Sequence, residues 1–385
     1  METMIQKVNQ AVASCPCGHP HIPVTLDSIV VEAGAVDLIP GYLAERGYRH
    51  IALVADSNTY EAAGKRVEQS LKDAGIASRL VLAQPNAVGD VVADEQTIIQ
   101  VLLEIDTEKT DLILVAGAGT LHDISRFIAF KTNKPFLSVP TAPSVDGFNS
   151  KGAPIIVRGE KITIPASSPV AIFADLDVLV QAPSRMVAAG FGDMLGKFTS
   201  LFDWTYGYRT AGERYCHAAY KITADALRRC AEHVESIGKR ERDGIRILMN
   251  GLIESGLAML IFGQSYPASG SEHHLSHYWE MEYIRLGKKQ LLHGAKVGVA
   301  CAEISALYRK IAGEGLMELD DQTKREIGQI PSPDQLREWL RTAGGPASPA
   351  ELGIDKELLD RSLKEAHQVR KNRNTLLKAY NERRA

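Results

Sequence analysis

Short apolar runs alternate with amphipathic stretches through the first half of the chain. The run 50–56 (His-Ile-Ala-Leu-Val-Ala-Asp) is apolar between charged flanks, which is typical of a strand buried on both faces. The stretch 60–75 repeats apolar residues every three or four positions, which predicts a helix. The same signals predict strands over 78–83, 111–116 and 135–140 and a helix over 91–103. Strands that alternate with helices favour βαβ units and a mostly parallel sheet.

The pattern changes in the middle of the chain. Two β-branched runs flank Arg158-Gly-Glu, which predicts a hairpin over 154–165, and a last strand is expected over 171–180. From Pro183 onward the periodicity is helical. The expected helices are 216–233, 245–262, 293–312, 333–342 and 356–381. The sequence therefore predicts an α/β domain over 1–181 and an all-α domain over 182–385.

Composition narrows the class of protein. Of the 385 residues 45% are hydrophobic and 24% are charged, which excludes wholesale disorder. The net charge of -3 argues against a nucleic-acid binder or a protein of anionic membrane surfaces. The first residues lack a secretory pattern, and the most apolar stretch, 247–263, is interrupted by Asn250 and Glu254, so no membrane insertion is expected. We expect a cytoplasmic protein.

The cysteines of the N-terminal segment allow two interpretations. Five scattered cysteines fit reduced thiols better than a disulfide framework. The segment Cys15-Pro-Cys17-Gly-His19-Pro-His21 has the composition of a metal knuckle, but two cysteines separated by one proline are closer than the ligand pairs of ordinary structural zinc sites. The sequence favours a plain N-terminal extension here, with metal binding as the alternative.

A glycine-containing loop is the first candidate for ligand binding. Gly117-Ala-Gly-Thr120 joins a buried strand to a helix, where small residues and free N–H groups favour a pyrophosphate. A tight turn is the alternative, but ligands of open parallel sheets collect at the carboxyl ends of strands. Asp56 ends an earlier strand, where a carboxylate accepts hydrogen bonds from an adenine ribose and disfavours a 2′-phosphate, so NAD(H) is favoured over NADP(H). Alternatively, Asp56 begins a turn with Ser57 and Asn58.

Two further features concentrate polar chemistry. The loop 140–150 (Pro-Thr-Ala-Pro-Ser-Val-Asp-Gly-Phe-Asn-Ser) follows a strand and is rigid and polar, as binding loops often are. In the helical half, Asp193 lies among apolar residues, His273 and His277 share a helix face, and His293 begins another helix. A carboxylate with two imidazoles from separate helices indicates a divalent metal site with open positions, although His274 is an alternative to His273.

On these motifs the chain resembles the superfamily of iron-dependent alcohol dehydrogenases, glycerol dehydrogenases and dehydroquinate synthases. Within it, the sequence is most similar to the glycerol-1-phosphate dehydrogenase family in its bacterial form. The resemblance covers roughly residues 25 to 310 and is carried by 117–123, 140–150, Gly192-Asp193, the spacing from His273 to His277, and 292–294. It implies a dehydroquinate-synthase-like fold, with a Rossmann-like N-terminal domain and a helical C-terminal one.

The resemblance also implies roles for single residues. Asp193, His273 and His293 are expected to hold the metal, with Asp193 also near the substrate, and Asp146 and His277 are expected to face the substrate as further catalytic residues. The residues expected to contact the dinucleotide are Asp56, Gly117, Ala118, Gly119, Thr120, Leu121, Thr141, Ala142, Pro143, Ser144 and Ser150.

The implied reaction is the reversible reduction of dihydroxyacetone phosphate to sn-glycerol 1-phosphate. NADH is the expected reductant, with NADPH as an alternative, and zinc or nickel is the expected Lewis acid on the carbonyl. Candidates for the cation that binds the phosphate are Lys197, Lys151 and Arg185, although Lys197 could instead pair with Asp193. The alternatives are a glycerol dehydrogenase acting on unphosphorylated polyols and a dehydroquinate-synthase-like cyclase, whose branch typically has Glu where this chain has Asp193. A homodimer is the expected assembly.

Overall fold

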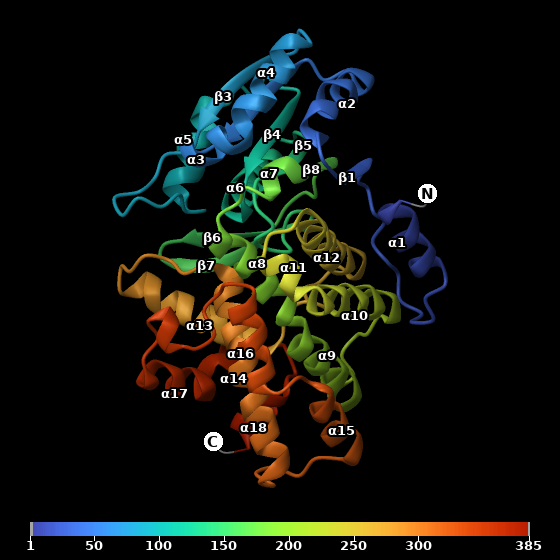
Figure 1. Cartoon of the computed structure of the whole chain (residues 1–385), viewed down its shortest axis with the longest axis vertical. Helices are drawn as coiled ribbons and strands as arrows, with labels where there is room; N and C mark the ends of the chain where they lie inside the picture. The colour runs from blue at the N-terminus through green and yellow to red at the C-terminus, as the bar shows by residue number, and fades with distance from the viewer. Residues whose placement is uncertain (1–2, 384–385) are drawn as a thin grey trace.

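The upper half of the molecule in Figure 1 is built on a parallel sheet. The computed structural model describes residues 3–383. Six strands follow the order β1-β8-β5-β4-β2-β3, and all their pairings are parallel. The strands are β1 (Ser28–Glu32), β2 (His50–Ala55), β3 (Ala77–Leu82), β4 (Leu112–Gly117), β5 (Phe136–Pro140) and β8 (Ala171–Asp175). The expected parallel α/β sheet is confirmed.

Both faces of this sheet are covered by helices. In β2 and β4, Leu53 and Leu114 point to one face and Val54 and Val115 to the other, because successive side chains of a strand alternate. The first face packs against α2 (Ile39–Arg46) and α4 (Lys65–Asp73), with η1 (Ala35–Leu38), α3 (Ser57–Thr59) and η2 (Tyr60–Gly64) leading into them. The second packs against α5 (Glu95–Glu104) and α6 (Gly119–Lys131).

The predicted hairpin is present as β6 (Gly152–Val157) and β7 (Glu160–Pro165). Its two-residue turn places Arg158 at φ 52° and Gly159 at φ 80°, as tight hairpin turns require. The hairpin lies between the sheet and helix α13 (Ser271–Arg285) (Figure 1). Lys161 of β7 makes an ion pair with Glu280 of α13 at 3.0 Å, so the hairpin joins the two halves of the molecule.

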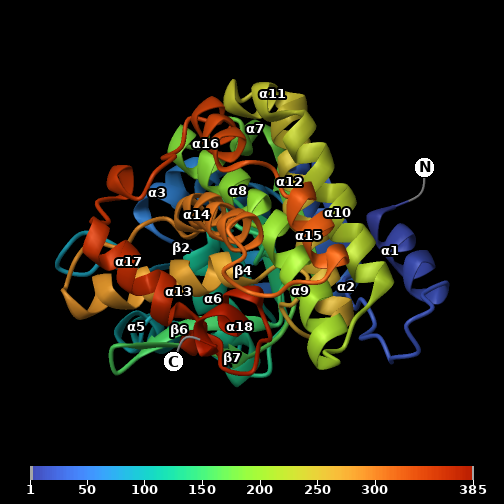
Figure 2. The same cartoon turned by 90° about the horizontal axis from the view of Figure 1, so that it is seen from below.

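After β8 every regular element in the described part of the chain is a helix. The long helix α14 (His293–Gly313) runs through the middle of this half, surrounded by α8 (Ser184–Leu195), α13 and α16 (Pro333–Thr342) (Figure 2). The other helices are α7 (Leu176–Leu179), α8 (Ser184–Leu195), α9 (Lys197–Ala211), α10 (His217–Glu232), α11 (Val234–Gly238), α12 (Arg242–Phe262), α15 (Asp321–Gln329), α16 (Pro333–Thr342), η3 (Ala350–Leu352), α17 (Lys356–Glu365), η4 (Ala366–Arg370) and α18 (Leu376–Glu382). The expected helical remainder of the fold is confirmed.

Three local expectations need correction. The strand predicted over 171–180 ends at Asp175, because its carboxylate accepts the N–H of Asp177 and begins helix α7. The single helix predicted over 356–381 is divided into α17, η4 and α18. Strand β1 was not predicted; it lies at the edge of the sheet and is only partly buried, so it lacks a continuous apolar run.

Two helices are placed in ways the sequence pattern did not indicate. Helix α1 (Met4–Ala13) belongs to the N-terminal segment but packs on the helical half beside α10 and α12, where Val8 joins the core (Figure 1). Helix α12 is long and apolar enough to cross a membrane by length and composition, whereas the sequence alone was interpreted as falling short of this. Most of α12 is buried against other helices, as in the core helix of a folded domain.

The alternation of the central strands has a direct consequence for stability. Leu114 is fully buried in β4, so Leu114→Ala leaves a cavity and is expected to lower the free energy of unfolding by about 2–5 kcal/mol. Leu103 on α5 is 80% exposed, and Leu103→Ala is expected to change the free energy of unfolding by less than about 0.5 kcal/mol. Urea unfolding of both variants measures the difference, and equal effects would contradict the assigned core.

Candidate active site

Three helices bring a carboxylate and two imidazoles together. Asp193 lies in the last turn of α8, His273 in the first turn of α13, and His293 is the first residue of α14. One ligand atom of each lies within 4.8 Å of the others, and Nε2 of His273 is 3.9 Å from Oδ1 of Asp193. This is the set that the sequence suggested as metal ligands.

The backbones of α8 and α14 touch at this point. A Cβ on Gly192 would lie 2.4 Å from the carbonyl oxygen of Gly294, and a Cβ on Gly294 would lie 1.9 Å from that of Ala189. Neither position has room for a side chain. The two glycines therefore allow the helices to approach closely. Asp193 follows Gly192 and His293 precedes Gly294, so this approach places Asp193 beside His293.

A buried carboxylate orients His273. Oε1 of Glu272 lies 2.8 Å from Nδ1 of His273 and also accepts the N–H of Gly270, and its Oε2 accepts the hydroxyl of Thr199. Burial opposes ionisation, but the hydrogen bonds from His273 and Thr199 prevail and lower the pKa of Glu272. The ionised Glu272 fixes the Nδ1–H tautomer of His273 and leaves Nε2 free toward Asp193, as carboxylates that hydrogen-bond metal-binding imidazoles do.

The charge of Asp193 is partly balanced by Lys197, one turn further along the chain. The Nζ atom of Lys197 lies 2.7 Å from Oδ1 of Asp193 and 2.8 Å from Oδ2 of Asp146, and all of the Lys197 side chain is buried. The N–H of Asp146 donates to Oδ2 of Asp193 at 3.0 Å. Lys197 is thus paired inside the site, whereas Lys151 and Arg185, the other two phosphate candidates, are exposed.

His277 lies at the edge of the cluster. Its ring centre is 6.2 Å from that of His273 and 6.0 Å from that of His293. Its Nδ1 lies 3.3 Å from Oε2 of Glu280. Burial lowers the pKa of His277 to about 3, so the imidazole is neutral near pH 7 and carries its free lone pair on Nε2.

Two lysines that the sequence did not single out adjoin His277 through Glu280. Lys161 lies 3.0 Å from that carboxylate and Lys296 lies 3.3 Å from it. The Nζ atom of Lys296 is buried without a hydrogen-bond partner within residues 3–383, and burial lowers its pKa to about 8. Lys296 was missed because nothing in its local sequence shows that the hairpin and α13 enclose it.

The structure also separates His273 from its neighbour. His274 is fully buried and is not part of the cluster around Asp193. Neither of its ring nitrogens has a hydrogen-bond partner in the described part of the chain, and burial, together with the charges of Arg370 and Arg373, lowers its pKa. The cluster therefore contains His273, which was the preferred choice from the sequence.

The glycine loop begins helix α6 at the carboxyl end of β4. Ala118 is the N-cap residue and supplies no side-chain cap, and Thr120 in the first turn is exposed. The N–H groups of Gly119, Thr120 and Leu121 therefore form an uncapped helix N-terminus, which is an arrangement that binds anions. The N–H of Thr141 donates to the carbonyl of Gly117 at 3.0 Å and joins this loop to the next one.

The loop after β5 is held rigidly. Thr141, Ala142, Pro143 and Ser144 are all buried, and a Cβ on Gly190 of α8 would lie 1.8 Å from the carbonyl oxygen of Pro143. The guanidinium of Arg126 donates to the carbonyls of Gly147 and Phe148. The Oγ atom of Ser150 accepts the N–H of Gly152 at 2.9 Å, where the hairpin starts.

Asp56 has the local role that was the alternative from sequence. Its Oδ1 accepts the N–H of Thr59 at 2.8 Å and caps α3. Its Oδ2 has no hydrogen-bond partner in the described residues, so one oxygen remains for a ribose.

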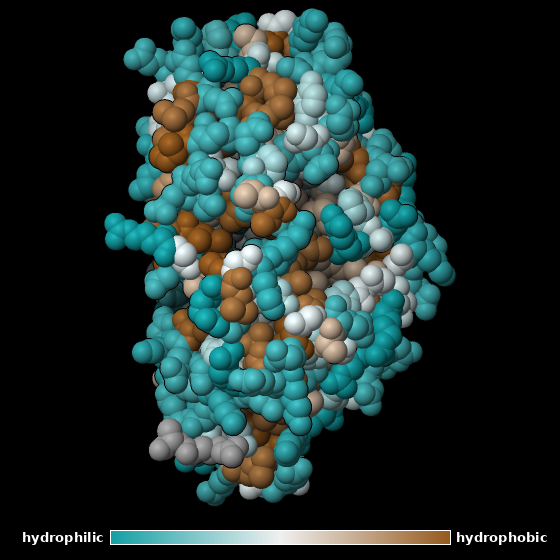
Figure 3. All heavy atoms as spheres, turned by 90° about the vertical axis from the view of Figure 1, so that its left-hand side faces the viewer, coloured by the Kyte–Doolittle hydropathy of each residue, from teal (hydrophilic) through white to brown (hydrophobic). Residues whose placement is uncertain are grey.

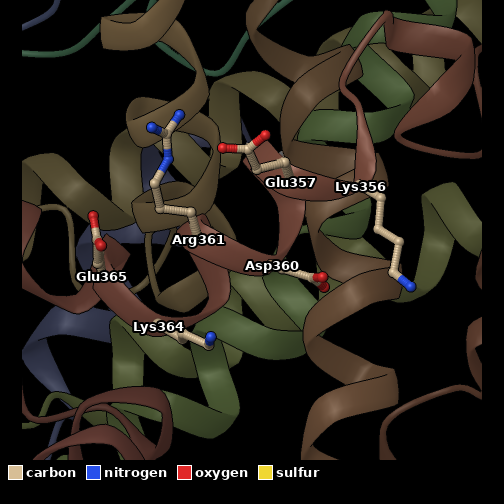
Figure 4. Close-up of a pocket in the computed structure, with 6 residues that line it drawn as sticks. All are labelled: Lys356, Glu357, Asp360, Arg361, Lys364 and Glu365. Carbon is tan, nitrogen blue, oxygen red and sulfur yellow. The ribbon is translucent and has the colours of Figure 1, made fainter.

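The surface around these elements is uneven. On the face shown in Figure 3, apolar side chains gather around a recessed region at mid-height, between the upper and lower halves. A separate open depression is lined by six charged residues of α17 alone (Figure 4). Its lining is Lys356, Glu357, Asp360, Arg361, Lys364 and Glu365. None of these belongs to the cluster of Asp193, and their pattern is that of a solvated helix face.

Comparison with known proteins defines the class first. The model of the iron-containing alcohol dehydrogenase family matches residues 30–183. The crystal structure of an alcohol dehydrogenase from an archaeal halo-thermophile of a Red Sea brine pool superposes with a TM-score of 0.70, 14% identity, and coverage of 95% of this chain and 98% of that one. The chain therefore has the fold of the iron-containing alcohol dehydrogenases.

The family within this class follows from closer relatives. A glycerol-1-phosphate dehydrogenase (NAD(P)+) of Geobacillus stearothermophilus is 44% identical over 99% of both chains. The protein of the same name from Geobacillus thermodenitrificans is 45% identical over 95% of both. The chain belongs to the glycerol-1-phosphate dehydrogenase family, as its motifs indicated.

The contact between α8 and α14 can be tested directly. Gly192→Ala adds a Cβ that the carbonyl of Gly294 cannot accommodate, so one helix must shift, and the metal affinity of the Asp193 cluster is expected to fall at least about tenfold. Gly313→Ala, at the other end of α14, meets nothing within 4 Å and is the matched control. Zinc titration of the metal-stripped variants measures the affinities. Unchanged binding by Gly192→Ala would show that the helix contact does not position the ligands.

Proposed function

We propose that this protein catalyses the reversible, metal-dependent reduction of dihydroxyacetone phosphate to sn-glycerol 1-phosphate by NADH, with NADPH as an alternative reductant. The observation that carries the proposal is the cluster of Asp193, His273 and His293, which lies beside the two lysines that flank Glu280. The names of the relatives support the same reaction.

The donor set fits a divalent metal. One carboxylate and two imidazoles supply three ligands and leave positions open, and the hydrogen bond from His273 to Glu272 presents the imidazole in the form that binds a metal. Zinc or nickel suits these nitrogen and oxygen donors. When bound, the metal supplies Lewis-acid polarisation of a substrate carbonyl. Asp193 also faces the space that the substrate occupies and so contributes to its binding.

The dinucleotide fits the carboxyl edge of the sheet. The free N–H groups of Gly119, Thr120 and Leu121 bind the pyrophosphate, with Gly117 and Ala118 shaping the approach. The free Oδ2 of Asp56 accepts hydrogen bonds from the adenine ribose. The remaining dinucleotide contacts that we propose are Thr141, Ala142, Pro143, Ser144 and Ser150. When bound, the dinucleotide supplies or accepts the hydride.

The substrate lies between the two halves of the molecule. Lys296, which is fully buried and shares the carboxylate of Glu280 with Lys161, binds the phosphate together with Lys161. His277 holds its Nδ1 proton against Glu280, so its Nε2 accepts a proton from the hydroxyl during oxidation and returns it during reduction. Asp146, fixed by Lys197 and Ser255, orients the substrate.

Each half of the chain has its own proposed binding role. We propose that residues 1–181 form the dinucleotide-binding domain and residues 182–385 the domain for metal and substrate, with closure between them excluding water. The proposed assembly is a cytoplasmic homodimer. An unphosphorylated polyol is the second candidate substrate, and the two ammonium groups of Lys161 and Lys296, which share the single carboxylate of Glu280, favour the phosphorylated one.

The proposed metal ligands can be tested by removing one of them. His293→Ala removes one of three ligands, so the protein is expected to lose one equivalent of metal and at least about a thousandfold in kcat while remaining folded. Metal analysis, circular dichroism and NADH oxidation measure these together. His233→Ala, which removes an imidazole at the end of α10, is the control. Full metal content in His293→Ala would overturn the assignment.

The role of Asp56 can be separated from its role as a helix cap. Asp56→Asn retains the cap but removes the charge, so the preference for NADH over NADPH, as a ratio of kcat/KM values, is expected to fall about threefold or more. Asp355 caps α17 in the same way, and Asp355→Asn is expected to leave the ratio unchanged. If both variants retain the wild-type ratio, the ribose contact lies elsewhere.

The phosphate contact predicts a substrate-dependent effect. Lys296→Met is expected to raise KM for dihydroxyacetone phosphate about tenfold or more, because a charge-assisted contact is lost, and to change turnover of unphosphorylated dihydroxyacetone much less. Lys310→Met, an exposed change on the same helix, is the control. Equal losses with both substrates would remove Lys296 from phosphate binding.

A further inference from the structure

A second cluster of metal-binding side chains lies away from Asp193. It consists of Cys15, Cys17 and His21 from the segment between α1 and β1 and Cys216 at the start of α10. One ligand atom of each lies within 4.8 Å of the others. The proposed reaction uses none of them, and His19, the other histidine of the segment, is exposed and outside the cluster.

Two of three separations between ligand atoms equal the edges of a tetrahedral zinc site, and the third is shorter. Zinc–sulfur bonds of about 2.3 Å and zinc–nitrogen bonds of about 2.0 Å imply ligand separations of roughly 3.5–3.8 Å. The sulfurs of Cys15 and Cys216 are 3.8 Å apart. Nε2 of His21 lies 3.5 Å from Sγ of Cys17 and 3.2 Å from Sγ of Cys216. Three thiolates with one imidazole are an established ligand set for structural zinc.

Backbone N–H groups point at two of the four ligand atoms. The N–H of Ala218 donates to Sγ of Cys15 at 3.5 Å, and the N–H of Ala219 donates to Sγ of Cys216 at 3.4 Å. Both donors belong to the first turn of α10, whose N-terminal dipole also stabilises negative charge. Gly18, at φ 67°, reverses the chain after Cys17 so that His21 returns to the cluster.

We propose that Cys15, Cys17, His21 and Cys216 bind a zinc ion that attaches the N-terminal segment to the helical half of the protein. The four protein ligands complete a tetrahedron and leave no open position, so this site is structural. The ion links residues separated by 195 positions in the sequence, and closing so long a loop restricts the unfolded chain. Figure 1 shows α1 beside α10, and the proposed zinc site lies between the segment after α1 and the start of α10.

Metal counting tests the proposal. The full chain, purified with a reductant and equilibrated with zinc, is expected to bind about two ions, and Cys216→Ser and His293→Ala are each expected to bind about one. Serine retains the cap of α10, so Cys216→Ser removes a ligand and leaves the helix start intact. Cys230→Ala removes a different thiol of α10 and should bind two. Equal zinc content in Cys216→Ser and the wild type would overturn the proposal.

Cobalt distinguishes the two sites independently of the count. Co²⁺ bound by three thiolates absorbs in the near ultraviolet through sulfur-to-metal charge transfer, whereas Co²⁺ bound by Asp193 and two histidines does not. The band is expected in the wild type and in His293→Ala and is expected to be lost in Cys216→Ser and strongly reduced in Cys17→Ser. A disulfide between Cys15 and Cys216 in the reduced preparation, or a wild-type protein without the band, would also overturn the proposal.

Discussion

The contact between α8 and the start of α14 is the constraint on which the site depends. Because Gly192 and Gly294 let the two backbones touch, a carboxylate from one helix and an imidazole from the other meet inside the protein. Burying the carboxylate of Asp193 is unfavourable, and burial with the nearby charge of Asp146 raises its pKa. Lys197 is buried between the two carboxylates and offsets that cost. The glycines therefore bring Asp193 into the site, and the lysine stabilises its charge there.

The rest of the fold places ligand-binding elements around this contact. The sheet ends its parallel strands at one edge, where the uncapped N-terminus of α6 and the loop after β5 lie next to each other. Gly190 packs this loop against α8, so the edge proposed to bind the dinucleotide and the cluster of Asp193 share one helix. The β6–β7 hairpin adds Lys161, whose ion pair with Glu280 joins the hairpin to α13 beside the site.

Local pattern was enough to predict the parallel sheet, most helices and the members of the Asp193 cluster. Buried strands show continuous apolar runs, and the ligands occur in motifs whose order along the chain is informative. What could not be predicted depends on distant partners. Glu272 and Lys296 reach their partners only when α13, α14 and the hairpin pack together, and Cys216 completes the proposed zinc site with residues 195 or more positions away. Strand β1 and the break after α17 also lack a local signal, since edge burial and tertiary contacts decide them.

We propose that a metal held by Asp193, His273 and His293 enables reduction of a phosphorylated ketone. The most direct measurement follows NADH absorbance with dihydroxyacetone phosphate, first with the purified protein, then after a chelator has removed metal, and again after zinc or nickel is restored. We expect oxidation of NADH that disappears with the metal and returns with it. Oxidation that persists in the stripped protein, or activity confined to glycerol and dihydroxyacetone, would contradict it.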